Sequence, residues 1–146
     1  MMRMSKLTDY GFMLLTEFAR QHAEVRPLSA RDLADSTGLP LPTVSKLLKT
    51  LSTHGLLVSH RGPNGGYKLA SRPSAITVEQ ILTALEGPVA ITECSLDTHS
   101  CSLEHACATR PHWVTINDTV RRALAGLNLA QMSLQPQPLV SLRGVS

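Results

Sequence analysis

The sequence predicts a mainly α-helical chain that carries one small β-hairpin and ends in a long helix. Along most of the chain, hydrophobic residues recur at intervals of three and four, the period of an amphipathic helix. Two of these stretches follow a serine or threonine with an acid or amide three positions later, a pattern that caps helix N-termini. One region differs, because two short strand-like runs flank a glycine-rich turn at residues 62–66.

The first helix is expected to begin at Ser5 or Thr8, since either hydroxyl can cap it, and to run to about residue 21. Its apolar residues are Leu7, Tyr10, Met13, Leu14 and Phe18. Their helical spacing places them on one face, which we expect to lie in the core.

Two further helices are expected to be joined by a short turn. Ser29 and Asp32 form a capping signature for the first, and Gly38 ends it, because glycine accepts the left-handed conformation after a helix. Pro40 precedes the second helix, which ends near residue 55. Its buried stripe consists of Val44, Leu47, Leu48 and Leu51. This order is typical of a helix-turn-helix.

A β-hairpin is expected directly after these helices. Residues 56–61 and 67–69 have the character of short strands. Asn64 and Gly65 in the turn are typical of hairpins, because both tolerate positive φ. Two helices followed by a hairpin make a winged helix-turn-helix, which we assign to residues 1–87 as a DNA-binding domain. The alternative is a hairpin that only caps the helices.

The remaining elements follow this unit. Thr77 and Gln80 form another capping signature, and Gly87 ends the helix that they open. A long helix is expected at 111–132, and residues 133–146 are expected to form a loose tail. The apolar residues of the long helix are Trp113, Ile116, Val120, Ala123 and Leu127. Their spacing is that of a coiled-coil seam too short to stand alone, so it predicts a homodimer, the alternative being packing on its own winged helix.

Composition and charge exclude several classes of protein. Hydrophobic residues make up 42% and charged residues 17%, and no apolar run approaches the ~20 residues of a membrane span. We expect a cytoplasmic chain with no membrane segment. Residues 1–72 carry ten Lys/Arg against five Asp/Glu, and the remainder four against six, which favours a phosphate-bearing partner for the first half. No catalytic triad, acid pair or phosphate loop stands out, so we do not expect an enzyme.

The third helix presents polar side chains opposite its buried stripe: Thr43, Ser45, Lys46 and Lys49. Hydroxyl groups bind base edges or phosphates and lysines neutralise phosphates, so residues 43–50 are expected to enter the major groove of double-stranded DNA. Arg61 and Lys68 lie on the glycine-rich wing, placed to approach the DNA backbone or the minor groove.

Three cysteines, Cys94, Cys101 and Cys107, lie in a polar stretch at residues 88–110. Their gaps of six and five residues are wider than those of structural zinc sites and favour an iron–sulfur cluster, either 2Fe–2S or 4Fe–4S. One ligand position is left open, and the alternative is three unrelated free thiols. The nearby histidines are His99, His105 and His112.

These segments together resemble the Rrf family of winged-helix regulators, the group that contains the iron–sulfur regulators IscR and NsrR. The resemblance covers about residues 2–132, and within the family the chain looks most like regulators of the SUF cluster-assembly system. The segments that carry it are Met2-Arg3-Met4-Ser5-Lys6-Leu7-Thr8-Asp9-Tyr10, Leu33-Ala34 before Gly38, Val44-Ser45-Lys46-Leu47-Leu48-Lys49, Gly55-Leu56-Leu57, Arg61-Gly62-Pro63-Asn64-Gly65-Gly66-Tyr67 and the three cysteines.

The resemblance implies a homodimer, a wing arginine at Arg61, a recognition helix at 43–50, a cluster on the three cysteines and a dimerisation helix containing Trp113. The chain departs from IscR-like members, which have one residue fewer between the first two cysteines and a histidine in place of Arg110. The fourth ligand is therefore open between His112 and Asp9 of the partner subunit, a position where some NsrR-like members use an acid.

The sequence thus predicts a dimeric redox-sensing repressor of iron–sulfur cluster assembly genes, whose affinity for a DNA operator depends on the cluster. Loss of the cluster is expected to change the spacing of the two recognition helices. Two alternatives remain: a thiol or zinc sensor without a cluster on the same scaffold, and a winged helix used only for protein contacts.

Overall fold

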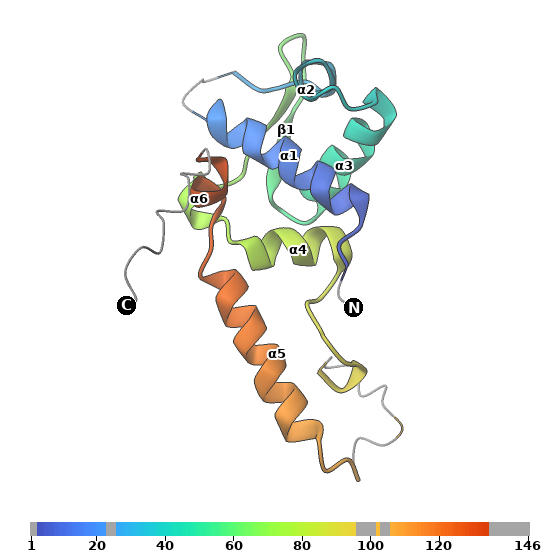
Figure 1. Cartoon of the computed structure of the whole chain (residues 1–146). Helices are drawn as coiled ribbons and strands as arrows, with labels where there is room; N and C mark the ends of the chain where they lie inside the picture. The colour runs from blue at the N-terminus through green and yellow to red at the C-terminus, as the bar shows by residue number, and fades with distance from the viewer. Residues whose placement is uncertain (1–2, 23–25, 96–101, 103–105, 135–146) are drawn as a thin grey trace, which may run out of the picture.

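The computed structural model describes residues 3–22, 26–95, 102 and 106–134, and it confirms the predicted fold class. Figure 1 shows a body of helices and one hairpin, from which a single long helix extends. The elements are α1 (Lys6–Arg20), α2 (Ala30–Thr37), α3 (Leu41–Thr53), β1 (Leu57–His60), β2 (Gly66–Leu69), η1 (Pro73–Ala75), α4 (Val78–Glu86), η2 (Glu93–Ser95), α5 (Arg110–Ala125) and α6 (Leu129–Ser133). None of the helices in the described ranges combines the length and apolar character needed to cross a membrane.

Local signals fix the helix ends where the sequence placed them. The Ser29 N–H donates to Asp32 Oδ2 (3.0 Å), and the Asp32 N–H donates to Ser29 Oγ (3.1 Å). Thr77 and Gln80 make the same reciprocal pair at the start of α4. Gly38, with a φ of 74°, ends α2. These contacts satisfy backbone groups that a helix end leaves without partners.

The buried face of α1 differs from the predicted one. Leu7 and Met13, which were expected in the core, are 41% and 39% exposed. The buried residues are Thr8, Gly11, Leu14, Leu15 and Phe18. A Cβ on Gly11 would lie 2.6 Å from Leu85 Cδ1, so the missing side chain allows α1 and α4 to pack closely. The helix is turned toward α4 because a small and a polar residue occupy that contact.

The start of α1 is tied to the end of α4 through Glu86. The Ser5 N–H donates to Glu86 Oε1 (2.9 Å), and the buried Thr8 hydroxyl donates to the same oxygen. The pKa of Glu86 is held below its ordinary value, chiefly by the Thr8 hydroxyl and then by the hydroxyl and N–H of Ser5. These donors stabilise the ionised carboxylate.

Glu86→Gln is expected to lower the free energy of unfolding at neutral pH by an amount that disappears in acid. A carboxyl group whose pKa is lower in the folded state adds stability above its unfolded pKa, about 4.3, and loses it as the pH falls through the folded pKa. Urea unfolding of both proteins at about pH 7 and about pH 3 measures this change. Asp35→Asn, at an exposed carboxylate, is the control. An equal difference at both pH values would contradict the assignment.

The hairpin is confirmed, but its turn uses different glycines from those expected. Strands β1 and β2 are antiparallel, with Leu57 opposite Leu69. Positive φ angles occur at Gly62 (117°) and Gly66 (155°) and not at Gly65. Gly65 is required for another reason, since a Cβ there would lie 2.5 Å from the carbonyl oxygen of His60, the last residue of β1.

The wing is anchored to the segment that precedes α2. The Leu28 N–H donates to the Tyr67 carbonyl (2.9 Å), and the Tyr67 N–H donates to the Leu28 carbonyl (2.8 Å). A Cβ on Gly66 would lie 2.6 Å from the carbonyl carbon of Leu28. The orientation of the wing therefore depends on close backbone contact at this position.

The helix predicted over 111–132 is two helices in the structure. α5 ends at Ala125, and α6 begins at Leu129 behind a capping box formed by Asn128 and Gln131. The sequence analysis did not identify this second start. The predicted continuous seam is therefore interrupted, because Leu127 lies between the end of α5 and the N-cap of α6.

The connection between α5 and α6 returns the chain to the body. The Val78 N–H donates to the Leu127 carbonyl (2.9 Å), and the Leu129 N–H donates to the Ile76 carbonyl (2.8 Å). Leu129 is fully buried in the same core as residues of α1, α3 and α4. Helix α6 packs on α1, so residues far apart in sequence complete one core.

Candidate nucleic-acid interface and cysteine site

Helix α3 separates its apolar and polar residues as predicted. Its buried residues are Val44, Leu47, Leu48 and Leu51. Ser45, Lys46 and Lys49 are exposed, and Thr43 is half-buried. The Thr50 hydroxyl donates to the Lys46 carbonyl (3.1 Å), so the helix itself occupies this donor. The four polar side chains give α3 a surface suited to base edges and phosphates.

One exposed residue at this surface was missed by the sequence analysis. Leu41, at the start of α3, is 39% exposed although it is apolar. An apolar side chain at the tip of such a helix can contact a thymine methyl group. The signal was available in the sequence, because Leu41 stands between two prolines at a helix start and outside the buried stripe.

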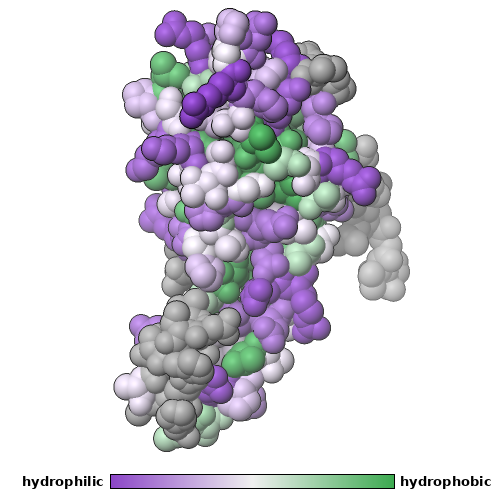
Figure 2. Space-filling model, turned by 180° about the vertical axis from the view of Figure 1, so that it is seen from behind, coloured by the Kyte–Doolittle hydropathy of each residue, from purple (hydrophilic) through white to green (hydrophobic). Residues whose placement is uncertain are grey.

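The wing places its two predicted basic residues differently. Arg61 is exposed and follows β1 directly, whereas Lys68 is half-buried within β2, opposite Val58. The hairpin contacts α3 through β1. Figure 2 shows that the end of the molecule with the wing and α2 is covered mainly by hydrophilic side chains. This end is suited to a charged partner such as DNA.

The cysteine segment is attached to α5. Cys94 lies in η2, which packs against α5. Just before it, the Ile91 N–H donates to Oδ1 of Asn117, a residue of α5 that is only 3% exposed. Cys107 is half-buried and comes shortly before the start of α5. The remaining predicted residues of this stretch, Cys101, His99 and His105, lie outside the described residues.

Cys107 has the environment of a reactive thiol. Its Sγ shares a hydrogen bond with Thr109 Oγ1 (3.2 Å). The pKa of this thiol is lowered, first by the Thr109 hydroxyl, then by the Thr109 N–H, and less by the N–H and charge of Arg110. Thiolates are the metal-binding form of cysteine, so Cys107, the cysteine whose side chain the structure describes, is suited to bind a soft metal.

The two candidates for a fourth ligand lie apart. Asp9 is exposed in the first turn of α1, and His112 is exposed in the first turn of α5. Figure 1 places α1 in the body and the start of α5 at the far end of the molecule. Within the described residues, no three His, Cys, Asp or Glu side chains gather closely enough to hold a metal ion. Within one chain, therefore, His112 is nearer to Cys107 than Asp9 is.

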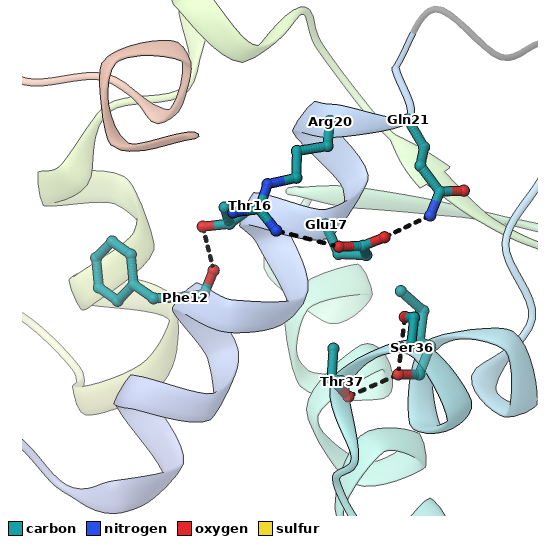
Figure 3. A network of polar contacts seen from close by, with 8 residues as sticks. Phe12, Thr16, Glu17, Arg20, Gln21, Ser36 and Thr37 are labelled. Atoms are coloured by element: carbon teal, nitrogen blue, oxygen red, sulfur yellow. Dashed lines mark hydrogen bonds and ion pairs between the residues drawn. The ribbon is translucent and has the colours of Figure 1, made fainter. Parts of the chain in front are cut away.

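Asp9 lines a groove of about 580 Å³ between α1, the end of α2 and α6. Figure 3 shows the polar residues along its wall. The Thr16 hydroxyl donates to the Phe12 carbonyl (2.8 Å), and Glu17 pairs with Arg20 (3.6 Å). Because these groups bind one another, they do not converge on a ligand.

The predicted seam of α5 is largely exposed. Trp113, Ile116 and Leu127 are 38%, 43% and 43% exposed, while Val120 is half-buried. Other groups fasten α5 to the body, including an ion pair from Arg121 Nε to an oxygen of Glu79 (2.8 Å). Packing of the seam on its own winged helix, the alternative considered from the sequence, therefore does not account for these three side chains.

Comparison with known proteins identifies relatives over nearly the whole chain. The model of the Rrf2 family, described as an iron-dependent transcriptional regulator, matches residues 4–134. CymR of Bacillus subtilis is 33% identical over 132 residues, which are 90% of each chain. IscR of Aliivibrio salmonicida is 29% identical over 129 residues, 87% of this chain and 76% of that protein.

Solved structures give the same result. The structure of CymR (YrzC), the global cysteine regulator of B. subtilis, matches with a TM-score of 0.70 at 32% identity, covering 91% of this chain and 97% of that one. T. potens IscR matches with a TM-score of 0.66 at 27% identity, covering 94% of each chain. The similarity therefore spans the winged helix, the cysteine segment and α5.

Proposed function

This chain belongs to the Rrf2 family of DNA-binding transcriptional regulators, and we propose that it is a cytoplasmic homodimeric repressor of iron–sulfur cluster assembly genes, of the SUF type, that senses an iron–sulfur cluster. It is a regulator and not an enzyme. Family membership also speaks against the alternative of a winged helix used only for protein contacts.

The observation that carries the proposal is the position of two cysteines beside α5. Cys94 lies in η2 against this helix, and Cys107, whose thiol pKa is lowered, precedes it directly. Soft thiolate ligands suit iron–sulfur clusters. Similarity to IscR supports the same assignment.

Cys94, Cys101 and Cys107 would hold the cluster, and Asp9 of the partner subunit is our choice for the fourth ligand. When bound, the cluster would supply a redox-active group that can be oxidised or lost. The Asn117 side chain accepts a hydrogen bond from the Ile91 N–H (3.1 Å). This bond holds the segment that precedes Cys94 against α5. A change in the cysteine segment would therefore reach α5 through the hydrogen bond between the Ile91 N–H and the Asn117 side chain.

The exposed seam supports the homodimer. Trp113 and Ile116 leave apolar surface on α5 that a second copy would cover. A two-fold dimer presents two recognition helices to half-sites about one helical turn apart. A small change in their separation would then alter operator affinity steeply.

Anaerobic purification tests the proposal. The protein should be brown, with broad visible absorption and with iron and sulfide in proportion to its chains. Operator fragments selected from the source genome should bind cluster-loaded and cluster-free protein with different affinities. Colourless protein that lacks iron and sulfide, or one operator affinity for both forms, would contradict it.

Arg61→Ala is expected to weaken operator binding by about 1–3 kcal/mol and to lower discrimination against other sequences, because a wing arginine reads a base or a narrow groove. Lys46→Ala or Lys49→Ala should instead weaken binding to all duplexes evenly and reduce the salt dependence by about one unit. Fluorescence anisotropy at several salt concentrations measures both effects. An unchanged affinity for Arg61→Ala would remove the wing from recognition.

A cluster-free thiol sensor is the second candidate, and the Cys107 environment favours it. A thiol with a lowered pKa reacts readily with oxidants and alkylating agents. In that case iron-free protein should change its operator affinity when Cys107 is oxidised, and Cys107→Ala should not respond.

A further inference from the structure

A second basic surface lies beside the wing and outside α3. A cleft of about 200 Å³ is formed by the end of α1, the segment before α2 and strand β2. Three basic side chains line it, His22, Arg26 and Lys68, together with Gln21 and Tyr67. Neither His22 nor Arg26 was singled out by the sequence, because they flank a loop rather than a helix face.

The cleft has a fixed framework. Phe18 and Leu28, each 4% exposed, are apolar residues of its lining and belong to the hydrophobic core. The paired backbone hydrogen bonds between Leu28 and Tyr67 (2.9 and 2.8 Å) join two of its walls. The basic side chains are therefore carried by three segments that are packed together.

No carboxylate in the described part of the chain forms an ion pair with His22, Arg26 or Lys68. By contrast, Arg20 and Arg121 are paired with glutamates. The pKa of Asp32 is lowered chiefly by the N–H and hydroxyl of Ser29 and least by the charge of Arg26, and the Asp32 carboxylate accepts the Ser29 N–H (3.0 Å). Basic side chains that line a cleft and form no ion pair within the described residues favour an oxyanion from outside.

We propose that this cleft is a phosphate-binding site, in which Arg26 and Lys68 bind the phosphate oxygens and His22 lies at the edge. Its volume is below the roughly 300–1,000 Å³ of pockets that hold whole small molecules, which suits a single phosphate group. Lys68 is on the same hairpin that leads to Arg61. The ligand is therefore a backbone phosphate of DNA, flanking the base pairs reached by α3 and the wing tip.

This assignment of the ligand rests on the proposed DNA binding, and the first experiment measures it. Operator affinity is determined by fluorescence anisotropy against salt concentration for Arg26→Gln and Lys68→Gln. Each variant should reduce the slope of log affinity against log salt by about 0.9 and weaken binding roughly threefold or more. Arg72→Gln, at an exposed arginine outside the cleft, is the matched control and should keep the native slope. On a duplex trimmed to the operator core, Arg26→Gln should bind like the native protein.

The second experiment titrates the cluster-free protein with inorganic phosphate at constant ionic strength and follows backbone amide resonances. Native protein should show shifts at Leu28 and Tyr67 that Arg26→Gln lacks, and the same spectra verify that the variant is folded. If Arg26→Gln loses the phosphate-induced shifts but keeps the native slope of log operator affinity against log salt, the cleft binds free phosphate and the DNA assignment is overturned. No shifts and no change in slope would overturn the site itself. If native protein binds no DNA at all, the proposed function fails, while the phosphate titration still decides whether the cleft binds phosphate.

Discussion

Replacing Cys94, Cys101 or Cys107 singly with alanine is expected to abolish stable cluster retention while leaving a folded dimer. Each cysteine supplies one of the thiolates that would hold the cluster, and Cys107, whose burial the structure describes, is not part of the hydrophobic core. Iron and sulfide per chain after anaerobic purification should fall close to zero. Sedimentation and circular dichroism should remain those of the native protein.

Ser102→Ala is the matched control, because Ser102 is an exposed residue of the same segment. Full iron content in any single cysteine variant would remove that cysteine from the ligand set. The same measurement chooses between the remaining ligands. Asp9→Ala should alter the visible spectrum and iron content, and His112→Ala should not; the reverse result would place the whole site within one subunit.

Gly66→Ala is expected to lower the free energy of unfolding by about 2–5 kcal/mol and to weaken operator binding strongly. An alanine at a φ of 155° is strained, and its Cβ would lie 2.6 Å from the carbonyl carbon of Leu28. Because the clash is with backbone, it is relieved only by moving the wing away. That movement breaks the two hydrogen bonds between Leu28 and Tyr67.

Gly62→Ala tests the effect of backbone strain without the steric clash that a Cβ on Gly66 would make with Leu28. Gly62 also has a positive φ, 117°, but a Cβ there would meet nothing within 4 Å. It should therefore cost only about 1–2 kcal/mol, without moving the base of the wing. Urea unfolding and operator anisotropy compare the two variants. Equal losses of stability would show that the Leu28 contact does not hold the wing.

The helix boundaries could be predicted because they depend on neighbours in sequence. The capping pairs at Ser29 and Thr77 act over three residues, and Gly38 ends α2 through its own backbone angle. The hairpin was predictable for the same reason, although Gly66 requires its glycine because of Leu28, nearly forty positions away. Interactions of that range leave no periodic signal.

The buried face of α1 could not be read from hydrophobicity. Thr8 and Gly11 are buried because Glu86 accepts a hydrogen bond and Leu85 needs space, both at the distant end of α4. Leu7 and Met13 remain exposed as a result. The apolar pattern therefore placed Leu14 and Phe18 correctly in the core, but it missed the part of the face whose closest contact is made by small and polar residues.

The candidate sites were predicted to different extents. The exposed polar residues of α3 follow from its buried stripe, and they lie where the sequence placed them. The attachment of the cysteine segment through Asn117 was not foreseeable, because one buried amide accepting from Ile91, 26 positions away, has no sequence signature. The basic cleft was missed because His22, Arg26 and Lys68 are joined only by the fold.

The return of the chain after α5 has a consequence for how this protein can change in evolution. The chain leaves the body at the C-terminal end of α4 and rejoins it at Val78, at the N-terminal end of the same nine-residue helix. Residues 88–126 are thus an insertion whose two junctions are about 13 Å apart. We expect that another segment that bridges this distance could replace residues 88–126 if it also replaces the contacts of α5 with α4, whereas truncation at residue 87 would remove Leu129 from the core.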